Sequence, residues 1–536
     1  MTATQFKVIG DTALSVSDVM EVARGAKVKL SEGAQMRIRA SREAVERVAQ
    51  EQPVYGFSRG FGQHQAISVS PSLQRALQRN LILTHAVSFG EPASHELVRA
   101  TMLLRVNALA MGHSGIRLEL VEKLIEVLNH PDLSPYVPMI GSLGASGDLS
   151  SMSHIGLTLI GEGRSYLRRD GVWSLVPSDE ALATCEIEPI ELDSKEGLAI
   201  NNGVQFSAAQ LLLIAQRLER HVTLATRLAG CLAEVMFGSD EAYLPELHRV
   251  RPYPGQQRVA SVLLDVFVDS GIRVAHPSDI DPNVQDPYSS RCLPQVIGPF
   301  FDALTQVYQT LDIEMNSATD NPLVFGDRVL SGGNFHGMPL AIASANLFNA
   351  YCGVVKILQA QLARLVDADK NRLKISCLID PRCDASISSG MMIAEYSAHA
   401  LGQLILSRNS LTFLHSGSSP SGQEDHVSHV PTILYNLEST LPHFEQLIAI
   451  IACLATRSYE LLALPELQAR YREEGRISQD ADLSPGQVGR RLIETVRPYF
   501  SLEEMGDDMY FRDHLARVAR ELIHTGVLAE RLEGAH

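Results

Sequence analysis

Long stretches with helical periodicity and faces rich in alanine and leucine constrain the fold of this chain more than any other feature of its sequence. Beyond Phe206 several of these stretches exceed 25 residues. We predict long helices over 208–236, 299–316, 340–367, 391–406 and 430–463. Because sustained heptads with charged flanks are absent, the pattern favours a bundle of long antiparallel helices over a coiled coil. The expected fold class is mainly α.

The N-terminal part shows a more mixed pattern. Shorter helices are expected over 41–50, 73–88, 95–111 and 118–128, and a short β-rich patch around 165–175 with a hairpin tip at Gly171-Val172-Trp173. The charged tail over 465–536 indicates a helical cap or an oligomer contact. We therefore expect a smaller mixed domain over 1–198 and a helical bundle with its C-terminal cap over 199–536, with the boundary near Leu198.

Charge and cysteine usage limit the class of partner. The 536 residues carry a net charge of −16, which argues against nucleic acid or an anionic membrane surface as the main partner. The apolar run over 447–455 is too short to span a bilayer, and residues 1–10 carry no signal pattern. Seven scattered cysteines without ligand spacing predict reduced thiols, no metal site and a cytoplasmic location.

Residues 141–150 read Gly-Ser-Leu-Gly-Ala-Ser-Gly-Asp-Leu-Ser and can make a reactive group from the chain itself. If the amide nitrogen of Gly147 reaches the carbonyl carbon of Ala145, a five-membered ring closes. Loss of two waters then turns the Ser146 side chain into a methylidene. The product, a 4-methylidene-imidazol-5-one, is an electrophile, which no standard side chain supplies. Small residues permit the close approach, whereas a plain turn before a helix is the alternative.

These ten residues, with His154 and the Gly161-Glu162-Gly163 that follow, resemble the signature of the aromatic amino acid ammonia-lyase and aminomutase family. The resemblance continues along most of the chain. It implies that the imidazolone forms autocatalytically, with no external cofactor and no metal. It also implies a homotetramer whose active sites are shared between subunits and act on a small amino acid.

Polar residues elsewhere match further functional positions of the family. Tyr55, on the glycine-rich loop 55–62, matches the lid-loop tyrosine that abstracts the β-proton. Asn202 matches the asparagine that contacts the electrophile and the substrate. Arg291 can hold an α-carboxylate through two parallel hydrogen bonds. Taken alone, without the resemblance, Tyr55 is more simply a loop anchor, Asn202 a helix cap or turn residue, and Arg291 a member of an ion pair. The resemblance adds Gln285, Tyr288 and the pocket-lining Phe335.

Two positions bear on the substrate. Glu424 lies in the sequence Gln-Glu-Asp-His-Val-Ser. By the resemblance, phenylalanine-specific members of the family have glutamine at this position, and histidine-specific members have glutamate. Thr84-His85 is similar to the Ser-His of histidine enzymes. His85 and Glu424 can hydrogen-bond an imidazole, whereas an apolar ring would leave them unpaired. Alone, Glu424 is equally compatible with a solvated helix start, and His85 with a core histidine.

These residues favour non-oxidative deamination of L-histidine to urocanate and ammonia. Whether the substrate amine or its ring attacks the electrophile stays open. Phe57-Ser58-Arg59, the polar Asn201 and Val204 depart from the histidine enzymes, so a 2,3-aminomutase, or a lyase for tyrosine or another polar-ring amino acid, also stays open. Two further classes are a catalytically dead scaffold, which the intact site residues disfavour, and a fumarase-like lyase, which has no internal electrophile.

Overall fold

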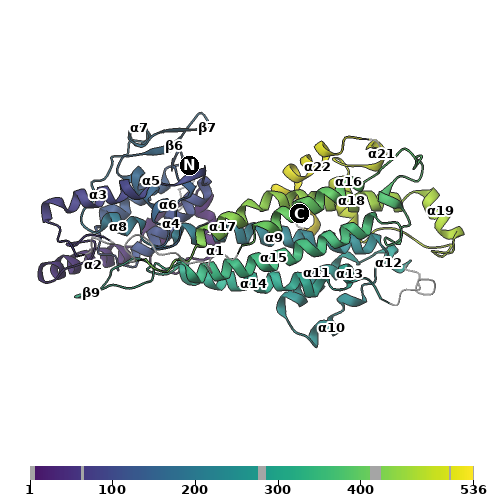
Figure 1. Cartoon of the computed structure of the whole chain (residues 1–536), viewed down its shortest axis with the longest axis horizontal. Coiled ribbons are helices and arrows are strands. Elements are labelled where there is room, and N and C mark those ends of the chain that lie inside the picture. The colour runs from purple at the N-terminus through teal and green to yellow at the C-terminus, as the bar shows by residue number, and fades with distance from the viewer. Residues whose placement is uncertain (1–5, 62–65, 276–284, 411–423, 506–508, 535–536) are drawn as a thin grey trace. The chain divides into compact units, whose positions relative to one another are not determined.

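The computed structural model describes residues 6–61, 66–275, 285–410, 424–505 and 509–534 (Figure 1). It is mainly helical, with 60% helix and 8% strand, which confirms the predicted fold class. The chain forms two compact units that interleave in sequence. The first unit comprises Met1–Ile214, Val307–Ala345 and Leu411–Tyr435, and the second comprises Ala215–Gln306, Asn346–Ser410 and Asn436–His536. A contiguous boundary near Leu198 stays a prediction from sequence.

The first unit contains all strands of the described residues, in four small sheets. Two of the sheets are a parallel pair of β1 (Phe6–Ile9) with β2 (Lys27–Leu30) and an antiparallel pair of β3 (Phe89–Pro92) with β5 (Pro138–Ile140). The others are the antiparallel β4 (Leu133–Pro135), β6 (Arg164–Arg169) and β7 (Val172–Pro177), and the pair β8 (Leu323–Phe325) with β9 (Arg328–Leu330). The β6–β7 hairpin lies where it was predicted, but its tip is shorter: Gly171, at a φ of +80°, is in the turn, whereas Val172 and Trp173 pair with Arg169 and Arg168 as part of β7.

Eight helices of the first unit precede the long helices (Figure 1). They are α1 (Val16–Ala23), α2 (Glu32–Glu51), α3 (Gln74–His85), α4 (His95–Ala110), α5 (Leu118–Asn129), α6 (Leu149–Leu159), α7 (Ser178–Thr184) and α8 (Glu196–Asn201). Serine side chains cap α2 and α4 by accepting a backbone N–H of the first turn. The Ser31 cap explains why α2 begins earlier than the predicted 41–50.

The long helices follow the predicted ranges closely. They are α9 (Gln205–Val235), α14 (Leu293–Met315), α15 (Met338–Val366), α16 (Met392–Arg408), α17 (Val430–Ser439) and α18 (Leu441–Leu462). The single helix expected over 430–463 is divided at Thr440, because Pro442 has no backbone N–H to continue the ladder. By length and hydropathy, 338–366 and 430–462 could cross a membrane, but 67% and 78% of their apolar windows are buried, as in core helices.

In the second unit, α16 packs against α18, and α18 packs against α20 (Gln487–Val496). A π-helix over Ala519–His524 packs against α18, and α23 (Val527–Glu533) packs against α20, so the tail is helical as predicted. The remaining helices are α10 (Pro245–Arg249), α11 (Pro254–Val266), α12 (Gly271–Val274), α13 (Tyr288–Arg291), α19 (Pro465–Glu473), α21 (Leu502–Met505) and α22 (Arg512–Val518). All seven cysteines are free thiols.

Candidate active site

The Ala-Ser-Gly tripeptide lies in a tight turn directly before α6. Gly147 has a φ of +79° and pairs with Gly203 in an isolated bridge. A Cβ atom at position 147 would lie 2.0 Å from the Gly203 carbonyl oxygen, and one at Gly144 would lie 2.1 Å from the Ser428 hydroxyl oxygen. Both positions therefore accept only glycine, which is the close packing that the sequence predicted around the tripeptide.

Two donors converge on the carbonyl oxygen of Ser146. The backbone N–H of Gly203 donates to it at 3.3 Å and the Asn202 Nδ2 at 3.2 Å. In return, the N–H of Asp148 donates to the Gly203 carbonyl at 2.7 Å. The Asn202 Oδ1 is buried and has no hydrogen-bond partner among the described residues. These contacts fit the imidazolone, since the Ser146 carbonyl would be its ring carbonyl and hydrogen-bond donors there strengthen an electrophile.

Two carboxyl groups near the tripeptide, those of Asp148 and Glu314, have raised pKa values. Asp148 is fully buried and accepts hydrogen bonds from the Ser207 N–H at 2.8 Å and from the Ser207 hydroxyl at 2.6 Å. Burial raises the pKa of Asp148 to about 6. Burial, with a smaller effect of the Asp148 charge, raises the pKa of Glu314 to about 7. Both groups therefore hold protons more tightly in the folded protein than in the unfolded chain.

Replacing Glu314 by glutamine should flatten the pH dependence of stability. The raised pKa means that the folded protein keeps this proton between pH 4.5 and about 7, where the unfolded chain has released it. Stability is therefore lost as the pH rises through this window, and Glu314→Gln should lose less. The midpoint of thermal unfolding across the window measures the difference. In the variant, the raised pKa of Asp148 should still cause a shallower fall of stability with pH. A slope equal to that of the parent protein would contradict the raised pKa of Glu314.

A buried cationic cluster supports the Asn202–Gly203 turn. Arg105 of α4 is 1% exposed, and its Nε donates to the Ala199 carbonyl at 2.7 Å and its Nη1 to Gln205 Oε1 at 3.0 Å. The buried Lys195 Nζ contacts Asp320 at 2.6 Å. Burial lowers the pKa of Arg105 to about 10. Sequence analysis missed this cluster, although an arginine within an apolar helix is costly without partners and was a detectable signal.

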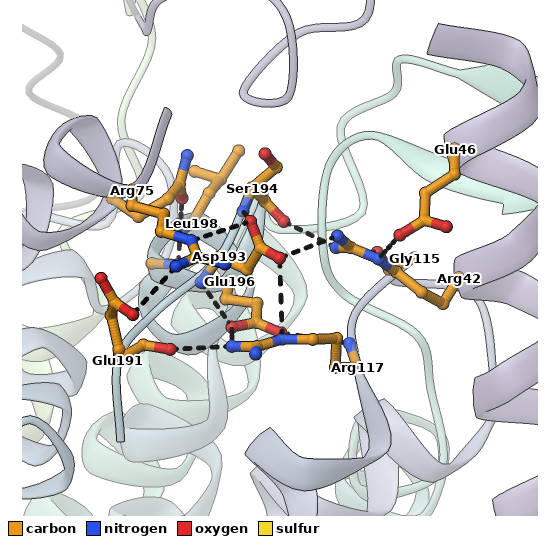
Figure 2. A network of polar contacts seen from close by, with 12 residues as sticks. Arg42, Glu46, Arg75, Gly115, Arg117, Glu191, Asp193, Ser194, Glu196 and Leu198 are labelled. Atoms are coloured by element: carbon orange, nitrogen blue, oxygen red, sulfur yellow. Dashed lines mark hydrogen bonds and ion pairs between the residues drawn. The ribbon is translucent and has the colours of Figure 1, made fainter. Parts of the chain in front are cut away.

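The segment that leads into α8 is fixed by ion pairs, as Figure 2 shows. Glu196 is fully buried, and its Oε2 contacts Arg117 Nη2 at 2.6 Å. Arg42 Nη1 donates to the Ser194 carbonyl at 3.0 Å, and its Nη2 lies 3.4 Å from Asp193 Oδ2. These contacts hold the start of α8, the helix after which Asn202 follows.

The loop that carries Tyr55 is tightly turned. The backbone N–H groups of Phe57, Ser58 and Arg59 all donate to the Val54 carbonyl, at 3.2, 3.0 and 3.1 Å. Arg59 Nη1 donates to the Ala66 carbonyl at 2.8 Å, so part of its guanidinium is occupied within the loop. Tyr55 is half-buried. Its role as the base stays a prediction.

His85 and Glu424 lie in the same unit, and the charge of Glu424 acts on His85. Burial lowers the pKa of His85, and the negative charge of Glu424 partly opposes this shift. His85 Nδ1 lies 2.9 Å from the Leu81 carbonyl, which can only accept, so Nδ1 carries the proton and Nε2 is left as an acceptor. The neighbouring Thr84 hydroxyl donates to the Asn80 carbonyl at 2.8 Å.

Further contacts in the first unit bring the other sequence blocks together. His336, next to the half-buried Phe335, has its Nε2 at 3.2 Å from His426 Nδ1, two residues after Glu424. Asn201 is fully buried, its Nδ2 donates to Ser153 Oγ at 3.1 Å, and its Oδ1 has no partner among the described residues.

The carboxylate-binding candidates lie in the second unit. Tyr288 is 72% exposed, and the Arg291 guanidinium carbon lies 5.0 Å from its ring centre. Arg291 Nε donates to the Asp286 carbonyl at 3.1 Å, and within the described ranges no carboxylate forms an ion pair with Arg291. Gln285 is exposed beside them. A single chain therefore holds Arg291 in one unit and the tripeptide in the other.

The mainly helical fold and the Ala-Ser-Gly turn held between glycines are features of an ammonia-lyase, and comparison with known proteins agrees. Residues 14–477 match the aromatic amino acid lyase family. A histidine ammonia-lyase from Gloeobacter violaceus is 36% identical, with 99% of this chain and 98% of that protein covered. The chain belongs to the aromatic amino acid lyase family and is a histidine ammonia-lyase-like enzyme.

Solved structures show the same fold. A histidine ammonia-lyase from Trypanosoma cruzi superposes with a TM-score of 0.82 at 29% identity, covering 98% of this chain and 95% of that chain. A tyrosine aminomutase from Streptomyces globisporus gives 0.85 at 28% identity, with 99% of both chains covered. Lyases and aminomutases therefore share this architecture, and the fold alone does not select between them.

Proposed function

We propose that this protein deaminates L-histidine to urocanate and ammonia without oxidation. The observation that carries the proposal is the electrostatic coupling of Glu424 to His85, in the unit that also holds the tripeptide. An imidazole offers one N–H and one nitrogen acceptor. The unprotonated His85 Nε2 can accept the N–H, and Glu424 can pair with the other side once that nitrogen is protonated.

The methylidene-imidazolone formed from Ala145, Ser146 and Gly147 supplies the electrophile that the amino acid side chains lack. Asn202 and the Gly203 N–H bind its ring carbonyl and keep it polarised. Tyr55 accepts the β-proton, which is too weakly acidic to leave without a positioned base.

The remaining residues orient the substrate. Arg291 holds the α-carboxylate as a bidentate pair, and Gln285 and Tyr288 position the amino acid head. Phe335, Thr84 and Asn201 line the side of the imidazole, where the unpaired Asn201 oxygen favours a polar ring. We further propose a cytoplasmic homotetramer in which the Tyr288–Arg291 helix and the tripeptide turn of one site come from different subunits.

Turnover of single amino acids tests this function. The purified protein is incubated separately with L-histidine, L-tyrosine and L-phenylalanine, and ultraviolet absorbance and released ammonia are recorded. Urocanate with stoichiometric ammonia from histidine alone is the expected result. A β-amino acid detected by NMR without ammonia would assign an aminomutase instead. No reaction with any of the three would show that Asn201 and Arg59 select another substrate.

Glu424→Gln should lower kcat/KM for histidine about 10- to 100-fold, because a hydrogen bond to a charged group contributes about 1.5–3 kcal/mol. The same change should affect the binding of phenylalanine, measured as competitive inhibition of histidine turnover, much less, since its ring offers no polar partner. Asp425→Asn is the matched control, because it removes the charge of the neighbouring carboxylate, which is exposed. Equal losses for histidine turnover and phenylalanine binding would contradict a role of Glu424 in recognising the ring.

A further inference from the structure

Gln78 is a fully buried glutamine of α3 that has no part in the proposed reaction. Its Nε2 donates to the Gly56 carbonyl at 3.0 Å. Its Oε1 accepts the N–H of Gly197 at 3.0 Å and that of Leu198 at 3.3 Å. One side-chain amide therefore joins the loop of the proposed base to the first turn of α8, the helix after which Asn202 follows.

Close packing reinforces this bridge at both ends. Gly56 has a φ of +69°, and a Cβ atom there would lie 2.7 Å from Leu198 Cδ2. A Cβ atom at Gly197 would lie 2.6 Å from the backbone oxygen of Gln78. The tyrosine loop, α3 and α8 thus meet with no space for a larger residue, and the side-chain amide of Gln78 is a polar link between them.

The two ends of the bridge are not equally dependent on Gln78. Helix α8 has independent anchors in the Glu196–Arg117 ion pair and in the Arg105 hydrogen bond to the Ala199 carbonyl (Figure 2 shows the first). The Gly56 carbonyl is held by Gln78 Nε2. Loss of the amide should therefore let the Tyr55–Gly56 segment shift between its buried neighbours Val54 and Phe57, and leave α8, Asn202 and the tripeptide turn in place.

We propose that Gln78 is a positioning residue that holds Tyr55 at a fixed distance from the electrophile. The proposal rests on the proposed function, in which Tyr55 removes the β-proton. A base must lie within hydrogen-bond reach of its proton, and a displacement of about 1 Å can cost about 100-fold in rate. Because α3 also carries Thr84 and His85 at its C-terminal end, the same helix positions the base and the residues that face the imidazole.

Two substitutions separate the ends of the bridge. Gln78→Met keeps the size of the side chain and removes all three hydrogen bonds. Gln78→Glu keeps the acceptor for Gly197 and Leu198 and loses the donor to Gly56 when ionised. Because burial raises the pKa of a carboxyl group, its exchange is compared at neutral and at alkaline pH, and the expected loss refers to the ionised form. We expect faster amide hydrogen exchange over 54–59 in both variants, and faster exchange at 197–198 only in Gln78→Met. Intact mass should still show the loss of two waters that marks the imidazolone.

A double-mutant cycle tests the consequence for catalysis. Gln78→Met should lower kcat about 10- to 100-fold with little change in KM, and it should have no further effect in a Tyr55→Phe background. Gln361→Met is the matched control. Gln361 is also fully buried and donates to a backbone carbonyl, that of Ala229, at 3.0 Å, but it lies in the second unit. It should lower stability without lowering kcat.

Each result decides the question. Unchanged exchange over 54–59 would show that Gln78 does not hold the loop, and additive losses in the cycle would show a structural role alone. Either result overturns the proposal. The exchange measurement needs no substrate, so failure of the proposed function, seen as a parent protein that releases no ammonia, is distinguished from failure of the bridge.

Discussion

Gly147→Ala is expected to abolish formation of the imidazolone. The residue would need a left-handed backbone at a φ of +79°, and its Cβ would lie 2.0 Å from the Gly203 carbonyl oxygen. The turn must therefore open, and the Gly147 nitrogen moves away from the Ala145 carbonyl. Intact mass should lack the loss of two waters, and ammonia release should fall about 1,000-fold or more, a fraction of the acceleration that enzymes usually provide.

The chain offers a matched control for this substitution. Gly171 in the β6–β7 turn has a φ of +80°, and an added Cβ atom would meet nothing within 4 Å. Gly171→Ala introduces the same backbone strain without the clash. It should keep both the mass change and the activity, with at most a small loss of stability. Imidazolone formation in Gly147→Ala would show that the contact with Gly203 does not control ring closure.

Tyr55→Phe is expected to lower kcat about 100- to 10,000-fold, the range that a general base usually contributes. The variant keeps the ring that lies 6.0 Å, edge to face, from Phe61, so the loop should remain folded. Intact mass should still show the complete loss of two waters. The reason is that Gly203 and Asn202 hydrogen-bond to the tripeptide turn. Comparison of kcat with KM across pH measures the effect.

The mass measurement separates the two large effects. A Tyr55→Phe protein without the imidazolone would show that the tyrosine acts in ring formation, whereas a fully active one would remove it as the base. Together with Gly147→Ala, which removes the electrophile and leaves Tyr55 unchanged, the pair distinguishes loss of the reactive group from loss of proton transfer.

Local patterns predicted the helices well because helix formation depends on residues three and four positions apart. The long apolar stretches gave α9, α14, α15 and α16 nearly within their observed bounds. Errors arose where single residues act through the backbone, as with the Ser31 cap of α2 and the break before Pro442. The interleaving of the two units depends on contacts far apart in sequence and could not be predicted from periodicity.

By itself, the sequence determined the class of the protein and predicted the chemistry of the tripeptide turn, because the Ala-Ser-Gly signature and the side chains of Tyr55 and Glu424 are matters of composition and local order. Only the tertiary structure revealed what constrains them. Gly203 closes on Gly147 from a distant segment, Arg105 is buried beside the turn, and Gln78 accepts from Gly197, 119 residues further along the chain. Such contacts form when burial forces each polar group to find a partner, and no local pattern specifies which one it finds.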